Sequence, residues 1–349
     1  MIRKHFKDYN FVGIPETGVT FRWGNIFNEN PEMGPWPELA DISISNYCIN
    51  ECEYCYRSSN SEGKQISVKE YDFILDQLTN DKYGSVFQVA LGGGEPVLHP
   101  DFSEILKITK EKFNIIPNYT TSGKFFDEKN IEATKKYCGA IAISYDPYRD
   151  LSLEDISEIG SYLKDNDIKA NIHYVISEKT LNNAIEILKG EFDDYFKSFN
   201  AIIFLTHKPH GRADAEDSIK SPKLLKSFLK LIDDPISKVR VGFDACFVPI
   251  LMKETKVDNN MIDSCECGFF SVYIDENLNV MPCSFCNDEK SKYNLKEFDF
   301  EDIWANKFSK YRENITNYGR LDCDDCDKLD DCRGKCPFFE ELFLCELTE

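Results

Sequence analysis

Six short apolar stretches, each bounded by turn residues, recur between residues 40 and 206 of this 349-residue chain. They read ADISIS, SVFQVALGG, NIIPNYTT, GAIAISYD, IKANIHYVIS and FNAIIFLT, and segments with helical spacing such as VKEYDFILDQLTN and DFSEILKITKEKF separate them. Strands that alternate with helices pair in parallel through right-handed crossovers, so the pattern predicts an α/β fold. Six strands favour an open, partial (β/α)6 barrel of the TIM type over a closed eight-fold one.

Polar or glycine-rich stretches follow directly on four of these strands. They are SNYC, GGGEP, TSG and SYD. Ligands of parallel sheets bind at the carboxyl ends of the strands, so we expect these stretches to surround one site.

The fourteen cysteines divide the chain unevenly: three lie in 48–55, Cys138 stands alone, and ten lie between residues 246 and 345. Cys138, at the entrance of a strand, is expected to be a packed core thiol. The composition shift after about residue 243 sets the last domain boundary. We predict an extension over residues 1–37, a barrel over 38–243 and a small cysteine-rich domain over 244–349.

Charge and hydropathy exclude two classes of partner. A formal charge of -20 argues against nucleic-acid binding, because phosphate contacts need a basic surface. No apolar run approaches the roughly 20 residues that span a bilayer, and the start MIRKHFKDYNFVG lacks the apolar stretch of a signal peptide. We therefore expect a cytoplasmic protein without a membrane partner, in which cysteines are metal or redox ligands rather than disulfides.

The stretch ISNYCINECEYCYRSS carries thiols at Cys48, Cys52 and Cys55 with no fourth cysteine or histidine nearby. Three thiolates can hold a four-iron cluster by three of its irons and leave one iron open to a non-protein ligand. A structural zinc site would close its shell with four protein ligands, and a disulfide would leave an odd thiol.

This CxxxCxxC motif, with Tyr54 before its last cysteine, and the GGGEP stretch after the second strand resemble the radical S-adenosylmethionine (radical SAM) enzymes. The resemblance spans roughly residues 38–243. It implies that the amine and carboxylate of SAM chelate the open iron. It also implies reductive cleavage of SAM to a 5′-deoxyadenosyl radical, which abstracts a hydrogen atom from the substrate.

The same resemblance implies further contacts to SAM. Backbone carbonyls of Gly93 and Gly94 and the Glu95 carboxylate would accept hydrogen bonds from the methionine ammonium, because glycine allows close backbone approach. A tight turn between strand and helix is the alternative for this stretch. Tyr54 of the cysteine motif and Ser144, Phe204 and Leu205 on later strands are further expected contacts. Asn171 and His173 alternate with apolar neighbours along the fifth strand, so we expect both to face the barrel interior.

The carboxy-terminal run CDDCDKLDDCRGKC, with a trailing cysteine, resembles the SPASM domain of radical SAM enzymes, which holds two auxiliary [4Fe–4S] clusters. Three [4Fe–4S] clusters are therefore implied. The outer auxiliary cluster would be bound by Cys323, Cys326, Cys332 and Cys345. The inner one would be bound by Cys265, Cys283 and Cys336.

The fourth ligand of the inner cluster stays open. The candidates are Cys246, Cys267 and Cys286, or no protein residue at all. We prefer Cys267, which lies beside Cys265 and before a glycine. Leu278 stands where the family has a glycine five positions before Cys283, so the turn is expected to differ. A pair of zinc knuckles is the alternative for these thiolates.

Radical SAM proteins with SPASM domains mostly modify peptides or proteins. We therefore expect an oxidoreductase that crosslinks a ribosomally made peptide through thioether or carbon–carbon bonds, with electrons from a flavodoxin or ferredoxin. Only about 40 residues precede the first strand, which is too few for the winged-helix leader-recognition domain of many relatives. Either the barrel and the SPASM domain bind the substrate directly, or a separate protein recognises the leader peptide.

Three alternatives stay open: an anaerobic sulfatase maturase, a small-molecule dehydrogenase of the same family, and a non-catalytic iron–sulfur electron-transfer protein. In maturases a catalytic aspartate follows the cysteine equivalent to Cys283, where this chain has Ser284. An electron-transfer protein would need four protein ligands for each cluster, which the amino-terminal triple does not supply.

No acid or base stands out, because a catalytic role requires reach to the substrate before a suitable pKa. The candidates are Asp146, His173, His207, His210, Arg212, Asp244 and Ser284. For each of them a structural role away from the substrate is the alternative.

Overall fold

The structure, a computed structural model, describes residues 1–27, 29–318, 323, 326–329 and 332–348. The chain forms two compact units. The first comprises Met1–Asn50, Ser59–Ile141 and Cys267–Arg312. The second comprises Glu51–Ser58, Ala142–Glu266 and Glu313–Glu349.

The sheet of the first unit has the strand order β8-β7-β4-β13-β14-β15. Strands β4, β7 and β8 are parallel, β13 is parallel to the other edge of β4, and β14 and β15 continue antiparallel. Their bounds are Leu39–Ser45 (β4), Gln88–Gly93 (β7), Ile116–Thr121 (β8), Ser271–Ile274 (β13), Asn279–Met281 (β14) and Tyr293–Asn294 (β15). The first three expected strands are therefore confirmed, whereas β13 extends the parallel sheet with a segment that the sequence pattern did not predict.

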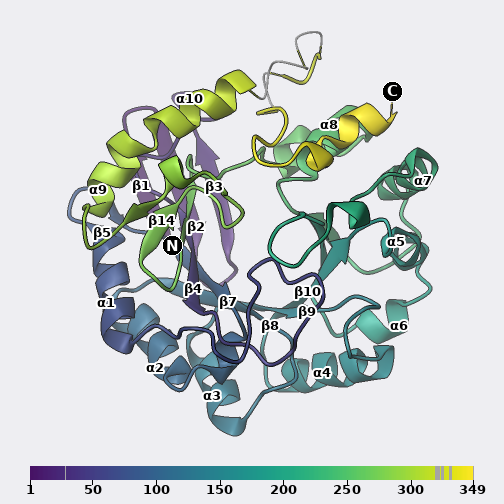
Figure 1. The fold of residues 1–349 in the computed structure, drawn as a ribbon, viewed down its shortest axis with the longest axis horizontal. Helices are drawn as coiled ribbons and strands as arrows, with labels where there is room; N and C mark the ends of the chain where they lie inside the picture. Colours follow the sequence, from purple (N-terminus) through teal and green to yellow (C-terminus); the bar gives the residue numbers. More distant parts are fainter. Residues whose placement is uncertain (28, 319–322, 324–325, 330–331, 349) are drawn as a thin grey trace. The chain divides into compact units, whose positions relative to one another are not determined.

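Helices α1, α2 and α3 lie along the outer side of β4, β7 and β8 (Figure 1). Ser67 starts α1 with a capping box, in which its side chain and that of Glu70 each accept from the other residue's backbone N–H. The helical bounds are Val68–Gln77 (α1), Phe102–Lys107 (α2), Glu128–Tyr137 (α3) and Phe300–Asp302 (α9), with π-helical turns at Ile108–Lys112 and Ile303–Lys307 and 3-10 turns at Pro96–Leu98 and Glu289–Ser291. Along β4, Ala40, Ile42 and Ile44 are buried in the core. Asp41 and Ser43 alternate with them and lie on the opposite face of the strand.

The residues before β4 form an antiparallel three-stranded sheet in place of an extension of uncertain shape. Its strands are β1 (Ile2–Phe6), β2 (Tyr9–Ile14) and β3 (Val19–Trp23), and a two-stranded ribbon of β5 (Thr79–Asn80) and β6 (Gly84–Ser85) also belongs to the first unit. Phe11 packs its ring 5.5 Å from that of Phe87. The Tyr9 hydroxyl donates to Glu38 at 2.8 Å, which attaches this sheet to the start of β4.

The strands of the second unit have the order β12-β11-β10-β9. Strands β10, β11 and β12 are parallel, with Ile172 opposite Ile202 and Ile202 opposite Val241. The strand bounds are Ile141–Ser144 (β9), Ala170–Ile176 (β10), Ile202–Thr206 (β11) and Val241–Phe243 (β12). The other three expected strands are thus confirmed, and β12 was not among those predicted.

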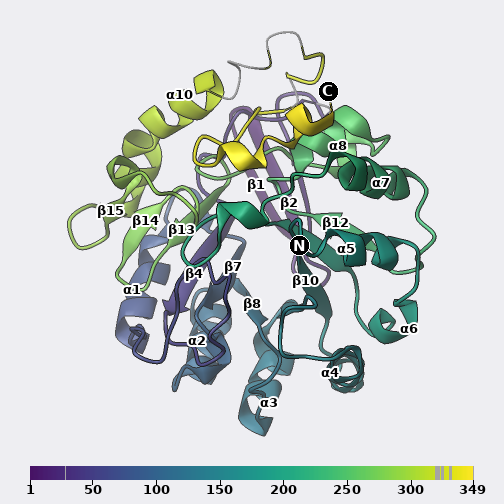
Figure 2. The same ribbon diagram turned by 45° about the vertical axis from the view of Figure 1, so that its right-hand side comes forward.

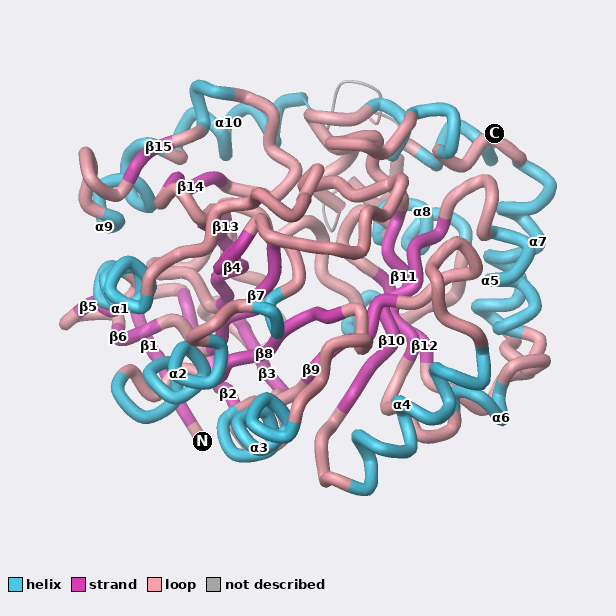
Figure 3. The backbone as a smooth tube through the Cα atoms, turned by 60° about the horizontal axis from the view of Figure 1, so that its bottom comes forward, coloured by secondary structure: helices cyan, strands magenta, loops and turns pink. Residues whose placement is uncertain are grey.

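Helices accompany these strands as the alternation requires (Figures 2 and 3). The helical bounds are Leu153–Asp165 (α4), Leu181–Leu188 (α5), Asp193–Phe196 (α6), Pro222–Asp233 (α7) and Val248–Glu254 (α8), with 3-10 turns at Ala215–Asp217, Asn259–Met261, Glu340–Leu342 and Leu344–Thr348. Helix α10 (Ser309–Tyr318) begins in the first unit and ends in the second. The Lys253 ammonium at the end of α8 donates to the backbone carbonyl of Cys345 at 3.2 Å, which fixes the carboxy-terminal turn against that helix. No helix in the described part of the chain is both long and apolar enough to cross a bilayer.

The turn between β13 and β14 keeps a glycine-like conformation with a leucine. Leu278 has a φ of 67°, in the left-handed region, and its side chain is 1% exposed. The Asp275 carboxylate accepts from the backbone of Asn277 and Asn279 and holds the turn closed. The turn was expected to differ because leucine replaces the glycine of the family. Its backbone keeps the left-handed conformation that glycine would adopt, and the difference is backbone strain at Leu278.

We predict an inverted order of stability for two variants of Leu278. Both L278G and L278A lose a buried side chain, a loss of about 2–5 kcal/mol, but only glycine relieves the left-handed strain of about 1–2 kcal/mol. L278G should therefore be at least as stable as L278A in thermal unfolding. At an unstrained position glycine is normally less stable than alanine. A lower thermal midpoint for L278G than for L278A would therefore show that Leu278 is unstrained.

Candidate functional site

The glycine stretch after β7 packs directly on the chain that leaves β4. Gly93 has a φ of 109°, and a Cβ there would lie 2.0 Å from the Ser45 carbonyl oxygen and 2.2 Å from the Ser43 hydroxyl. A Cβ on Gly94 would lie 2.1 Å from the Tyr47 carbonyl oxygen, and its N–H donates to Ser45 at 2.6 Å. No larger residue fits at either position, so the stretch forms a tight turn at the carboxyl ends of two neighbouring strands.

Glu95 continues this turn and is 2% exposed. Its carboxylate accepts from the hydroxyl of Thr121, the last residue of β8, at 2.6 Å and from the backbone N–H of Ser122, directly after the strand, at 2.9 Å. Burial raises the pKa of this carboxyl, although these hydrogen bonds act in the opposite direction. The carboxylate therefore ties the glycine turn to the loop after β8, and its contact with SAM stays a prediction.

Two further acidic residues of the first unit are Asp41, near the start of β4, and Glu276, which follows β13; neither was predicted from the sequence. The Glu276 carboxylate, buried after β13, accepts from the Ser43 hydroxyl at 2.8 Å, and its backbone carbonyl accepts from Lys64 at 2.6 Å. Asp41 lies on the same face of β4 as Ser43, and burial raises its pKa from 3.8 to about 7. A charged residue inside an alternating strand is the signal that would have found it.

Replacing Asp41 by asparagine should change how stability depends on pH. The unfolded carboxyl ionises near 3.8 and the folded one near 7, so native Asp41 increasingly favours unfolding as the pH rises through that window. The thermal midpoint of D41N should exceed that of the native protein at pH 8, and the difference should shrink at pH 4. D194N, which alters a side chain that is 99% exposed, is the matched control. An equal gain at both pH values would contradict the raised pKa.

The cysteine loop, residues 51–58, lies in the second unit and contacts the loop after β11. The Arg212 N–H donates to the Cys55 carbonyl at 3.0 Å, and its Nε donates to the Cys52 carbonyl at 2.9 Å. Gly211 has a φ of 69°, and a Cβ there would lie 2.3 Å from the Tyr56 carbonyl oxygen. Arg212 thus holds the backbone of the cysteine loop, which is a structural role rather than the acid–base role considered for it.

Cys48, the first thiol of the motif, belongs to the first unit. Its backbone N–H donates to the carbonyl of Asn60 at 2.9 Å, where the chain returns from the cysteine loop. Cys48, Cys52 and Cys55 are all partly buried.

Tyr54 of the cysteine loop is bound to the loop after β9. Its hydroxyl donates to Asp146 Oδ2 at 2.6 Å, and Arg149 Nε donates to the same oxygen at 3.0 Å. The other Asp146 oxygen accepts from the Tyr148 N–H at 3.0 Å. Arg149 Nη1 also lies 3.9 Å from the sulfur of Cys52. Burial raises the pKa of Tyr54 well above 10, so its hydroxyl keeps the proton it donates.

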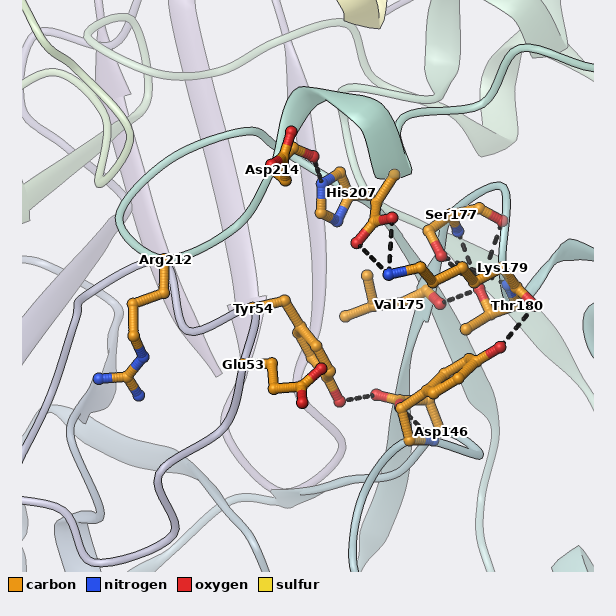
Figure 4. A pocket seen from close by; sticks show the side chains of 12 residues that line it. Glu53, Tyr54, Asp146, Val175, Ser177, Lys179, Thr180, His207, Arg212 and Asp214 are labelled. Atoms are coloured by element: carbon orange, nitrogen blue, oxygen red, sulfur yellow. Dashed lines mark hydrogen bonds and ion pairs between the residues drawn. The ribbon is translucent and has the colours of Figure 1, made fainter.

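A cavity of about 220 Å³ opens beside Tyr54, over the carboxyl ends of β10 and β11 (Figure 4). The Lys179 ammonium on its wall pairs with Asp217 at 2.8 Å. His207 Nε2 donates to the Asp214 carbonyl at 2.8 Å, which leaves Nδ1 of this ring as its second polar atom. Side chains that line the cavity include Glu53, Tyr54, Asp146, Lys179, His207 and Arg212.

Two expected site residues lie on the same face of β10. His173 is in the middle of the strand, and its pKa is lowered to about 4, first by burial and then by the positive charge of Arg149. The ring is therefore neutral at pH 7. Asn171 lies at the amino end of the strand, where its side chain accepts from Asn200 at 3.2 Å. The cavity is lined instead by Val175, two residues beyond His173 at the carboxyl end.

Phe204 does not fit the cofactor contact expected of it. Its side chain is fully buried, and its ring lies 5.7 Å from that of Tyr174, 5.3 Å from Phe228 of α7 and 5.6 Å from Phe243. Successive residues of a strand face opposite sides of the sheet, so Leu205 shares the face of His173 instead. Phe204 is therefore a core residue, and only Leu205 remains a candidate on this strand.

Asp244, considered as a base, is bound to its neighbours. Its carboxylate accepts from the Thr206 hydroxyl at 2.8 Å and forms an ion pair with the buried Lys208 at 2.5 Å. His210 stacks its ring edge-on at 6.1 Å from Phe339, and burial lowers its pKa. Ser144, at the end of β9, is partly buried, as is Ser284 after β14.

Four carboxy-terminal thiols, those of Cys323, Cys326, Cys332 and Cys345, belong to the second unit. Cys345 is 9% exposed, and its pKa is raised to about 12, first by burial. Its thiol also interacts electrostatically with those of Cys332, Cys323 and Cys326. Backbone N–H groups point at this region as well, since Gly334 donates to the Cys332 sulfur at 3.3 Å. The four thiols are the set that the SPASM spacing implies for the outer cluster.

The cysteines considered for the inner cluster divide between the units. Cys283 and Cys286 form one turn of the first unit, in which the Cys286 N–H donates to the Cys283 carbonyl at 3.1 Å. The Cys286 thiol has its pKa raised to about 12, mainly by burial and partly by Cys283. Cys267 also belongs to the first unit, whereas Cys246, Cys265 and Cys336 belong to the second. Among the described residues, no three His, Cys, Asp or Glu side chains are grouped so that they could hold a metal ion.

Residues 42–146 match the model of the Radical SAM superfamily. PqqA peptide cyclase of Gluconobacter oxydans is 28% identical over 130 residues, which cover 36% of this chain and 33% of that protein. A 7,8-dihydro-6-hydroxymethylpterin dimethyltransferase of Methanocaldococcus jannaschii is 21% identical over 87% of this chain and 65% of its own length. The chain therefore spans less than two thirds of these two relatives. The mycofactocin maturase MftC of Mycobacterium tuberculosis is 25% identical over 88% of this chain and 81% of its own.

Solved structures resemble the fold. Streptococcus suis SuiB bound to its precursor peptide SuiA has a TM-score of 0.69 at 19% identity, over 87% of this chain and 72% of that one. Native anSMEcpe with bound AdoMet has a TM-score of 0.65 at 20% identity, over 88% of this chain and 95% of that one. The expected α/β partial barrel is confirmed. The match to the Radical SAM superfamily model covers residues 42–146, and a cysteine-rich carboxy-terminal region follows later in the chain.

Proposed function

We propose that this radical SAM enzyme cleaves SAM reductively and crosslinks a ribosomally made peptide through a thioether or carbon–carbon bond. The observation that carries the proposal is the cysteine loop, whose Tyr54 side chain lines a cavity at the carboxyl ends of β10 and β11. A peptide cyclase and MftC among the relatives, and the SuiB structure with its precursor peptide, support a peptide as substrate.

The residues of the chain suit the cofactors that this chemistry needs. Cys48, Cys52 and Cys55 would hold the first [4Fe–4S] cluster, because they offer three thiolates and leave one iron open. The space that a Cβ would fill at Gly93 and Gly94 is taken by backbone, so polar backbone atoms are closely grouped where the methionine end of SAM would bind. When bound, SAM and this cluster supply a 5′-deoxyadenosyl radical that removes a hydrogen atom from the substrate.

The protein orients the reacting partners. Tyr54 is fixed by Asp146, so the wall of the cavity next to the cysteine loop is rigid. His173, neutral at pH 7, and Leu205 share one face of the sheet and would contact SAM or substrate there. Asp146, His207 and Arg212 are the acid–base candidates that line the cavity, and His207 keeps one ring nitrogen outside its hydrogen bond to the Asp214 carbonyl.

Two auxiliary clusters would take up the electron that the crosslinked product must lose. The outer one would be bound by Cys323, Cys326, Cys332 and Cys345, the set that the SPASM spacing implies. The inner one would be bound by Cys265, Cys283 and Cys336. The position of Cys286 beside Cys283 makes it a rival to Cys267 for the fourth place. A flavodoxin or ferredoxin would reduce the first cluster, and a separate protein could present the leader peptide.

A small-molecule substrate is the second candidate. The alignment with the pterin dimethyltransferase covers 87% of this chain, and this extent of the match favours a small-molecule substrate. A sulfatase-maturase activity is disfavoured by Ser284, which occupies the position where maturases have an aspartate.

Anaerobic reconstitution with iron and sulfide, followed by dithionite and SAM, tests the proposal. The native protein should bind about twelve irons and release 5′-deoxyadenosine, whereas the variant with alanine at Cys48, Cys52 and Cys55 should bind about eight and release none. Deoxyadenosine from the triple variant, or none from a fully loaded native protein, would contradict the reaction.

The same reaction with candidate precursor peptides tests the substrate class. Each crosslink should remove two hydrogen atoms from the peptide, measured by mass spectrometry, and fragmentation should then fail to separate the joined residues. SAM cleavage that is stimulated by a pterin or another small molecule and by no peptide would replace the peptide with a small-molecule substrate.

A further inference from the structure

We propose that Arg149 raises the reduction potential of the first cluster by donating a hydrogen bond to the sulfur of Cys52, with Asp146 as the residue that positions it. The inference rests on the proposed function only in that Cys48, Cys52 and Cys55 hold this cluster. Arg149 was not among the residues selected from the sequence, and its place beside the motif comes from the fold.

The guanidinium group reaches two partners at once. Nη1 lies 3.9 Å from Cys52 Sγ, within the range of a hydrogen bond to sulfur, and Nε donates to Asp146 Oδ2 at 3.0 Å. The Arg149 side chain is 19% exposed and that of Asp146 is 1% exposed. The ion pair is therefore largely shielded from water. Charges interact more strongly in such a shielded position than at the protein surface.

Asp146 is itself held by three donors. Besides Arg149 it accepts from the Tyr54 hydroxyl at 2.6 Å and from the Tyr148 N–H at 3.0 Å. The Arg149 N–H also donates to the Asp146 carbonyl at 3.0 Å. The guanidinium group therefore cannot turn away from Cys52 without breaking a buried ion pair. The planar fork of arginine makes both bonds possible, whereas a lysine has a single charged nitrogen for the two partners.

An electron added to the cluster increases the negative charge on its sulfur ligands. Hydrogen bonds to these sulfurs stabilise the reduced state and are among the main determinants of cluster potential. The chain carries a formal charge of -20, which opposes the uptake of an electron, so a cation directed at Cys52 acts against that background. Asp146 Oδ2 accepts hydrogen bonds from both Arg149 and Tyr54. It therefore positions the donor to the Cys52 sulfur together with the aromatic ring that lines the cavity.

A redox titration of the native protein, R149M and R149K, followed by electron paramagnetic resonance with SAM present, tests this inference. The cluster that binds SAM is recognised by the change in its signal when SAM is added. In R149M the ratio of reduced to oxidised cluster at a fixed potential should fall about tenfold, which corresponds to a downward shift of about 59 mV for one electron. R149K, which keeps the charge but cannot make both bonds, should shift in the same direction by less.

R240M is the matched control, because Arg240 also lies in the second unit but donates to Asn200 at the amino ends of the strands. The reduction potential of the SAM-binding cluster in R240M should equal that in the native protein. An unchanged potential in R149M would overturn the role of Arg149. If R149M binds less iron than the native protein, R149K decides instead, and an unchanged potential there overturns the role. A native protein without any SAM-sensitive cluster signal would refute the proposed function itself, which is a separate outcome.

Discussion

The buried carboxylate of Asp146 is the interaction on which the architecture of the site in the second unit depends. It is 1% exposed and accepts hydrogen bonds from Tyr54, Arg149 and Tyr148. A buried carboxylate left without partners would be strongly unfavourable, so these three donors are required by burial itself. Because Tyr54 lies between two cysteines of the motif, the partners of Asp146 also determine where the cysteine loop lies against β9.

A second constraint acts in the first unit, where backbone packs on backbone. Gly93 and Gly94 contact the chain after β4 so closely that a Cβ at either position would collide with carbonyl oxygens. Glu95 then ties this turn to Thr121 and Ser122. The carboxyl ends of β4, β7 and β8 are thus joined by close backbone contacts and by the Glu95 carboxylate. Such rigid ends suit a site that must hold a cofactor in one geometry.

The sequence pattern predicted β4 and the five strands from β7 to β11 because each is a short apolar run bounded by turn residues. It did not predict β13, since SVYI is short and lies among cysteines, and its place beside β4 depends on a pairing across more than 200 residues. Phe204 was expected to contact SAM only because the resemblance places such a contact near the sixth strand, whereas its ring packs against Phe228 of α7.

Motif spacing predicts the ligands of the outer cluster, since Cys323, Cys326 and Cys332 follow within one short run and Cys345 trails it. The inner cluster was less predictable, because its candidates belong to both units and no spacing rule separates Cys267 from Cys286. Arg149 and Glu276 were missed for a related reason. Each lies in a loop after a strand and gains its importance from a partner that is distant in sequence, such as Cys52 for Arg149 and Ser43 for Glu276.

The central claim is that the cluster bound by Cys48, Cys52 and Cys55 keeps one iron open for SAM. Electron–nuclear double resonance of the reduced protein, with SAM isotopically labelled in its amine nitrogen and carboxylate oxygens, tests this contact most directly. We predict couplings from both labels to the cluster, and their loss when Cys52 is replaced by alanine. A reduced cluster signal that shows neither coupling in the native protein would contradict the account.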